Sequence, residues 1–146
     1  MQIRKIKNTD FHIMINIFFD IYAKYPWSFS WLTIEKTEDY FYELINMPKS
    51  ISYSFLHEGA LCGGCFGFVS NCGALPTYEL REIFIDSSRQ NKGLGSKALH
   101  EVEIQLKKEG ITSIKLSTVR STKAFTYYIK NGYFENDEAV NMLKFL

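Results

Sequence analysis

The chain has 146 residues, a length typical of one domain, and we expect a single domain over 1–146. Seventeen Lys and Arg against sixteen Asp and Glu leave a formal charge of +1, which argues against nucleic acid and anionic membranes as partners. Hydrophobic residues make up 46% of the chain, which excludes wholesale disorder, and no apolar run is long enough for a membrane span or a signal peptide. We therefore expect a folded domain in the cytoplasm.

Apolar residues recur at helical spacing in some segments and alternate with polar residues in others. In chain order, the patterns predict a strand over 3–6, helices over 10–23 and 33–47, strands over 51–57, 60–69 and 77–85, a helix over 93–109, a strand over 112–119, a helix over 121–131, and strands over 133–134 and 139–146. Hairpins come first and strand–helix alternation follows, so we expect antiparallel pairing at one side of a sheet and parallel pairing at its centre. The predicted fold class is α/β (α+β): one mixed sheet of about seven strands, flanked on both faces by about four helices.

The loop between the first two predicted helices is unusually aromatic. Aromatic residues are concentrated between Phe11 and Tyr42, and those on the helices are expected to pack on a sheet. Trp27, Phe29 and Trp31 lie in the loop itself and are candidates for closing over a bound substrate. Simple packing into the core is the alternative interpretation of these three rings.

The chain contains three cysteines, Cys62, Cys65 and Cys72. The Cys62-Gly-Gly-Cys65 spacing is compatible with a redox or metal site. However, the residues that follow are typical of a strand, and a redox pair of this kind should open a helix whose dipole lowers the thiol pKa. We therefore expect buried, small apolar side chains and no metal site.

The strongest chemical signal lies between Ile85 and Ser96, where a strand ends, a polar loop turns and a helix begins. Gly93 and Gly95 leave no side chain between the backbone and a ligand, and the N–H groups at a helix start carry partial positive charge. These features suit a pyrophosphate, although the third glycine of the dinucleotide fingerprint and the Gly-Lys-Ser/Thr of a P-loop are absent. From these residues alone, anion binding and a close-packed turn remain alternatives.

The same loop resembles the acetyl-CoA loop of the GNAT superfamily of acyl-CoA-dependent N-acetyltransferases. That loop reads Q/R-x-x-G-x-G/A, which the residues from Gln90 to Gly95 match. Downstream the family has a small residue, an aromatic pair and then Gly-Phe or Gly-Tyr, which match Ala124, Tyr127-Tyr128 and Gly132-Tyr133. The order of elements matches along the whole chain, and the specific motifs lie within 77–134. The chain departs from the family at Ser121, where Asn is frequent, and at Gln90, where Arg is commoner.

The resemblance implies a GNAT-like fold and an N-acetyltransferase. It would transfer an acetyl group from acetyl-CoA to a primary amine of a small molecule or peptide, by direct attack in a ternary complex. The residues implied to hold acetyl-CoA, the co-substrate, are Ile83, Phe84, Ile85, Gln90, Asn91, Lys92, Gly93, Leu94, Gly95, Ser96 and Ser121. The alternatives are a catalytically inactive acyl-CoA-binding module and, within the enzyme class, an aminoglycoside 6′-N-acetyltransferase. The last predicted strand could also pair with a second copy to form a homodimer.

Two carboxylates on the strand over 77–85 are candidates for the base that takes a proton from the amine. Strand alternation places Glu79 and Glu82 on opposite faces, unless a bulge changes the phase. The string Tyr78-Glu79-Leu80 is similar to that around the catalytic Glu of certain aminoglycoside 6′-N-acetyltransferases, so the resemblance favours Glu79, acting through water, with Glu82 as second choice. It also implies that Tyr128 is the acid that faces the CoA sulfur. An ordinary surface carboxylate and a half-buried core ring are the structural alternatives for Glu79 and Tyr128.

Overall fold

The computed structural model describes residues 1–24, 27–30, 32–71 and 75–146. Two of the residues singled out above, Trp31 and Cys72, lie outside the described residues. The chain forms two compact units, Met1–Leu116 and Ser117–Leu146. The first unit holds the sheet, and the second holds the last helix.

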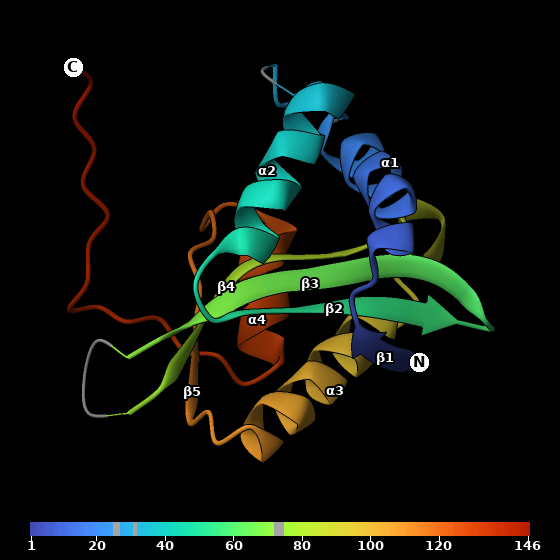
Figure 1. Ribbon diagram of the computed structural model, residues 1–146. Helices are drawn as coiled ribbons and strands as arrows, with labels where there is room; N and C mark the ends of the chain where they lie inside the picture. Colours follow the sequence, from blue (N-terminus) through green and yellow to red (C-terminus); the bar gives the residue numbers. More distant parts are fainter. Residues whose placement is uncertain (25–26, 31, 72–74) are drawn as a thin grey trace. The chain divides into compact units, whose positions relative to one another are not determined.

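The first unit is a mixed sheet with helices on both of its faces, as predicted. Its elements are β1 (Gln2–Lys5), the short turn η1 (Asn8–Asp10), α1 (Phe11–Tyr22), α2 (Ile34–Asn46), β2 (Ser50–His57), β3 (Ala60–Ser70), β4 (Thr77–Ile85), the short turn η2 (Ser87–Arg89), α3 (Leu94–Lys108) and β5 (Ser113–Lys115). The strands are ordered β1-β2-β3-β4-β5, and all neighbours are antiparallel except β4 and β5, which are parallel. Helices α1 and α2 cover one face of the sheet and α3 covers the other (Figure 1).

The prediction of about seven strands is wrong, because the described residues form a sheet of five. No strand forms over 133–134 or 139–146, and the strand expected over 112–119 is reduced to Ser113–Lys115. An alternating apolar pattern supplies one face of a strand, but a strand also needs a ladder of backbone hydrogen bonds, which the described residues of 133–146 do not make. As a result the parallel β4–β5 pair lies at an edge of the sheet rather than at its centre.

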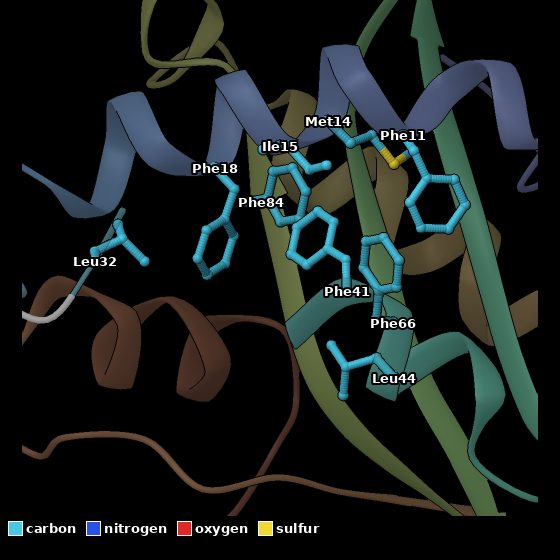
Figure 2. Packing of buried hydrophobic residues seen from close by; sticks show 9 residues of the cluster. All are labelled: Phe11, Met14, Ile15, Phe18, Leu32, Phe41, Leu44, Phe66 and Phe84. Carbon is cyan, nitrogen blue, oxygen red and sulfur yellow. The ribbon is translucent and has the colours of Figure 1, made fainter. Parts of the chain in front are cut away.

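The core between the sheet and the helices α1 and α2 is built largely from aromatic rings. The Phe41 ring lies 4.6 Å from that of Phe66 and 5.1 Å from that of Phe18, measured between centroids. Figure 2 shows the buried cluster, which consists of Phe11, Met14, Ile15, Phe18, Leu32, Phe41, Leu44, Phe66 and Phe84. Each fully buried side chain of this size contributes roughly 1.5–3 kcal/mol. Because Phe84 belongs to β4, this packing fixes the end of β4 against both helices.

Helix α3 packs on the opposite face through a second buried group. The hydroxyl of Tyr78 lies 3.5 Å from the Sγ of Cys65, and both side chains are buried. The hydroxyl of Tyr53 donates to Glu109 Oε1 at 3.2 Å, and Lys5 Nζ donates to the same oxygen at 2.7 Å. These contacts connect the C-terminal end of α3 to β1 and β2.

The start of α1 is held by a buried carboxylate, Asp10. Arg4 donates to it through Nη1 at 2.6 Å and Nη2 at 2.8 Å, and the Ser54 hydroxyl donates at 2.6 Å. The backbone N–H of Lys7 adds a fourth hydrogen bond at 2.9 Å. The hydrogen bonds from Arg4 are the main reason that the pKa of Asp10 falls from 3.8 to about 2, against the opposing effect of burial. Because the folded state favours the charged carboxylate, this group stabilises the fold only while it is ionised.

Lowering the pH should therefore remove this contribution. It is fully present above the ordinary pKa of 3.8 and is lost as the pH falls towards about 2, which corresponds to about 2 kcal/mol of unfolding free energy. Urea unfolding at several pH values between about 5 and 2 measures the free energy of unfolding. This free energy should fall less with decreasing pH in Asp10→Asn than in the unmodified chain. Asp20→Asn, at an exposed carboxylate of α1, is the control and should keep the full loss. An equal loss in the unmodified chain and Asp10→Asn would contradict this account.

The second unit consists of a turn, the helix α4 (Lys123–Lys130) and an extended tail. The helix begins after Thr122, two residues later than predicted, and the Thr122 hydroxyl donates to the carbonyl of Val119 at 2.7 Å. Arg120 and Glu135 form a two-pronged ion pair that joins the turn to the start of the tail. In the described parts of the chain, no helix combines the length and the hydropathy that a membrane crossing requires.

Candidate active site

The two edges of β4 are paired to different extents. Towards β3 the pairing runs from Thr77 to Ile85, whereas towards β5 it covers only Thr77–Glu79. Within the described residues of the first unit, the backbone over 83–85 therefore has no neighbouring strand on the second edge. Backbone N–H and C=O groups on such an edge can pair with an extended ligand, as they would with an added strand.

A bulge in β4 changes which of its side chains share a face. The pairing with β3 leaves one extra residue in β4, Arg81. Phe66 pairs with Glu82, and Phe68, two residues further along β3, pairs with Glu79. Phe66 and Phe68 are two residues apart in β3, so their side chains lie on the same face of the sheet. Cross-strand partners also share a face, so Glu79 and Glu82 both lie on this face, beneath α1 and α2. The prediction that Glu79 and Glu82 lie on opposite faces is thus wrong, and the bulge, which was the alternative to simple alternation, is present.

Glu82 is mostly buried and is held by hydroxyl groups from both covering helices. Tyr40 of α2 donates to Glu82 Oε1 at 2.8 Å, and the hydroxyl of Tyr22 of α1 also hydrogen-bonds to the carboxylate. Burial raises the pKa of Glu82 to about 7, although these hydrogen bonds and the charge of Arg81 act in the opposite direction. The same burial, together with the charge of Glu82, raises the pKa of Tyr40, so its hydroxyl stays protonated and remains a donor. Glu82 therefore changes its charge near neutral pH.

Glu79 has a different environment on the same face. Its side chain is 23% exposed and lies 3.6 Å from Lys115 Nζ of β5, measured to Oε1. This ammonium group pairs with the carboxylate and competes with any other cation for it. The two predicted carboxylates are thus brought to one face, one paired with a lysine and the other held by tyrosines.

Half-buried aromatic rings extend from Glu82 towards the segment 27–30. The Tyr22 ring lies 5.4 Å from that of Trp27 and 5.6 Å from that of Phe29, and it is stacked on Phe29 at an interplanar angle of 11°. Two of the predicted substrate residues are therefore connected to Glu82 through Tyr22. Tyr22 and Tyr40 are not among the site residues predicted from the sequence, because residues at helical spacing resemble ordinary core positions.

The loop after β4 delivers the chain to the start of α3. Gly93 takes a positive φ of 73° and makes no side-chain cap, and the first helical hydrogen bond runs from the N–H of Lys97 to the carbonyl of Gly93. The N–H groups of the first three helical residues, 94–96, consequently have no acceptor within the helix. They form a site of partial positive charge at the end of the loop.

Side chains within this loop order the loop itself. Gln90 Nε2 donates to the carbonyl of Ile85 at 2.8 Å, and Lys92 Nζ donates to the carbonyl of Ser88 at 3.2 Å. The N–H of Asp86 donates to the carbonyl of Cys62 at 2.8 Å, which attaches the loop to β3. The predicted anion site therefore rests mainly on backbone donors in this structure.

Two of the predicted residues, Ser121 and Tyr128, belong to the second unit. Ser121 lies in the turn before α4 and is exposed. The ring of Tyr128 lies 5.2 Å from that of Tyr127 and 5.5 Å from that of Tyr133, measured between centroids. The group that the first unit brings together thus consists of Glu79, Glu82, the rings and the loop, without these two residues.

The cysteines of the Cys-x-x-Cys sequence are both buried in β3. Cys62 Sγ donates to the carbonyl of Phe55 at 3.4 Å, whereas the Sγ of Cys65 lies 3.5 Å from the hydroxyl of Tyr78. Burial raises the pKa of Cys62 and raises that of Cys65 to about 12, so neither thiol is poised to become a thiolate. Among the described residues, no group of three or more His, Cys, Asp or Glu side chains is arranged to hold a metal ion.

The fold and the site together define a class of protein: an α/β domain with an open strand edge leading to a helix N-terminus. The model of the acetyltransferase (GNAT) family matches residues 14–133. The chain therefore belongs to the acetyltransferase (GNAT) family. A comparison with curated proteins finds no match.

Solved structures share the fold at low sequence identity. A protein described as "a possible acetyltransferase" from Clostridium difficile 630 superposes with a TM-score of 0.80 at 15% identity, covering 99% of this chain and 96% of that one. An aminoglycoside acetyltransferase from an uncultured soil metagenomic sample, in complex with sisomicin, superposes with a TM-score of 0.72 at 16% identity, covering 99% of this chain and 95% of that one. A transcriptional regulator from Bacillus halodurans C-125 superposes with a TM-score of 0.74 at 15% identity, covering 98% of this chain and 99% of that one. Proteins with such different names share this fold, so the acceptor must be argued from the site.

Proposed function

We propose that this chain transfers an acetyl group from acetyl-CoA to a primary amine of a small molecule or peptide, by direct attack of the amine in a ternary complex. The observation that carries the proposal is the open edge of β4 over 83–85, which leads through the loop to the free N–H groups of α3. An extended pantetheine arm carries amides that can pair with such an edge, and a pyrophosphate suits a helix N-terminus.

The loop residues divide between backbone donors and loop-ordering contacts. We assign the pyrophosphate to the N–H groups of Leu94, Gly95 and Ser96, which have no acceptor within the helix. A Cβ added at Gly93 would meet nothing within 4 Å, so glycine is required there by its backbone conformation rather than by space. Gln90 contributes by holding the carbonyl of Ile85, at the point where β4 ends.

Glu82 is our first choice for the base, which reverses the order suggested by resemblance. An alkyl ammonium group must lose its proton before the nitrogen can attack, and a base works best when its pKa lies near the working pH. The pKa of Glu82 is raised to about 7, whereas Glu79 lies beside a lysine ammonium group. We keep Glu79 as the second carboxylate of the site, where it favours the approach of a cationic amine.

Tyr128 remains the proposed acid for the departing thiolate of CoA. Its phenol is suited to this step because a tyrosine hydroxyl is protonated at neutral pH, so it can donate a hydrogen bond to the developing thiolate and can pass it a proton. Tyr127 is about 100° away around the helix and cannot take the same position. We likewise propose Ser121 as a contact to the pantetheine arm.

Thermal unfolding with acetyl-CoA tests the proposal. At 100 times its dissociation constant, acetyl-CoA should stabilise the fold by about 2.7 kcal/mol, a rise of several degrees in the melting temperature, whereas ATP and NAD should not. Ser96→Glu places a carboxylate at the helix start and should abolish the shift. His100→Glu, at an exposed position further along α3, is the matched control and should retain it.

The outcomes separate the alternatives. The absence of a selective shift would contradict the proposal. A selective shift without thiol release for any primary amine would instead indicate an inactive acyl-CoA-binding module. A shift with thiol release would support the transferase.

A further inference from the structure

We infer that the acceptor is a primary amine carried on an apolar alkyl or aryl skeleton, with its ammonium group at Glu82 and its skeleton against the rings of Tyr22, Trp27, Phe29 and Tyr40. This inference rests on the proposed transfer reaction, because it assigns the acceptor of the same site. It selects one chemical class from among the amines that the reaction could use.

The first observation is that Glu82 still has capacity for a cation. A carboxylate has about four acceptor directions, and the hydroxyls of Tyr22 and Tyr40 account for two of them. Both hydroxyls are neutral donors, and among the described residues no basic side chain forms an ion pair with Glu82. Arg81 favours the charged carboxylate through its own charge, and its side chain hydrogen-bonds to the Tyr40 hydroxyl. A mostly buried carboxylate without an ion-pair partner is a favourable position for a small ammonium group.

The second observation is the chemical character of the surroundings. Phe18 is fully buried under the cluster, with its ring 4.2 Å from that of Tyr22 and 6.3 Å from that of Tyr40. Tyr22, Tyr40, Trp27 and Phe29 are only partly buried, so part of their aromatic surface remains open to solvent. The buried ring therefore holds the outer rings in place, and these rings present an apolar surface beside the carboxylate.

The two observations together favour an apolar amine. Ring faces attract an ammonium group through cation–π interactions, and they contact methylene or aryl groups favourably. A polyhydroxylated amine would bring hydroxyl groups against these rings and would lose hydrogen bonds to water without replacement. Discrimination of this kind typically amounts to about 10–200-fold for each apolar group that a pocket accommodates.

Direct binding tests the inference without acetyl-CoA. Calorimetric titration of the full chain with 2-phenylethylamine and with glucosamine, at a pH of about 8 where Glu82 is charged, should give at least ~10-fold tighter binding of 2-phenylethylamine. Trp27→Ala should weaken the binding of 2-phenylethylamine by about tenfold and the binding of glucosamine much less. Glu82→Gln should weaken the binding of both amines. Tyr42→Ala removes an exposed ring from the same helix as Tyr40 and is the control, with both affinities unchanged.

The results distinguish this inference from the proposed function. The inference would be overturned if glucosamine bound as tightly as 2-phenylethylamine or more tightly. It would also be overturned if Trp27→Ala lowered the affinity for both amines equally. Absence of 2-phenylethylamine binding would also overturn it, while a selective acetyl-CoA shift would leave the transferase proposal intact. Thiol release from acetyl-CoA should follow the same order of kcat/KM, and the reverse order would contradict the assignment.

Discussion

Replacing Glu82 with Gln should lower kcat by about 10²–10⁴-fold, the range that general-base catalysis typically contributes. Gln cannot take a proton from the amine, but it keeps the size of the side chain and an oxygen that can accept from Tyr40. The measurement is thiol release at saturating acetyl-CoA and amine. A loss in kcat that exceeds the change in KM would indicate that the group acts in the transition state.

The pH profile provides the control for this variant. Since the pKa of Glu82 is raised to about 7, kcat of the unmodified chain should rise as the pH increases through that value and then level off. Glu82→Gln should lack this rise, whereas Glu79→Gln should keep it and lose less activity. If Glu79→Gln removes the rise and Glu82→Gln keeps it, the base is Glu79.

The stability of Glu82→Gln should move in the opposite direction from its activity. The fold favours the protonated form of Glu82, so its contribution is fully present below the ordinary pKa of 4.5 and is lost as the pH rises to about 7. At about pH 8 the charged carboxylate costs up to about 3 kcal/mol, which a neutral amide avoids. A variant that unfolds at higher urea concentration and yet turns over slowly cannot owe its lost activity to misfolding.

The sequence predicted the strand over 77–85 correctly but could not predict which carboxylates share a face. Leu80 and Phe84 are both buried and four residues apart, which looks like one continuous apolar face. In the structure, the extra residue Arg81 turns them to opposite faces, Leu80 towards α3 and Phe84 towards α1 and α2. When both faces of a strand are covered, apolar residues occur on both faces. The alternating pattern then does not reveal where a bulge inserts one extra residue.

The rings were predictable as a group but not in their roles. The aromatic residues of the two helices were expected to pack on a sheet, and Tyr22 and Tyr40 do pack against the aromatic core. That their hydroxyls converge on Glu82 depends on how α1, α2 and β4 are brought together, which separations of 42 and 60 residues along the chain do not encode locally. The loop from Gln90 to Gly95 was recognisable because its chemistry is carried by adjacent residues.

Substituting Gly63 with Ala should be among the most destabilising single changes on β3. A Cβ at this position would lie 2.1 Å from the carbonyl oxygen of Phe84 and 3.1 Å from the Cα of Ile85, both of them backbone atoms of β4. A side chain can move aside, but a paired strand must separate to make room, so we expect a loss of about 3 kcal/mol or more in urea unfolding. The same separation would displace the open edge of β4, so the thermal shift with acetyl-CoA should also decrease.

Gly59→Ala provides the comparison that isolates this close approach. Gly59 lies at the β2–β3 hairpin with a φ of 77°, and a Cβ there would meet nothing within 4 Å, so the substitution costs only the left-handed conformation, about 1–2 kcal/mol. The acetyl-CoA shift should remain intact in Gly59→Ala, because Gly59 lies in the hairpin turn, outside the stretch of β3 from Gly63 to Cys65 that pairs with the open edge over 83–85. If Gly63→Ala is no less stable than Gly59→Ala, β4 tolerates displacement at Phe84. The open edge would then be a flexible feature, and the acetyl-CoA site would depend on the start of α3 instead.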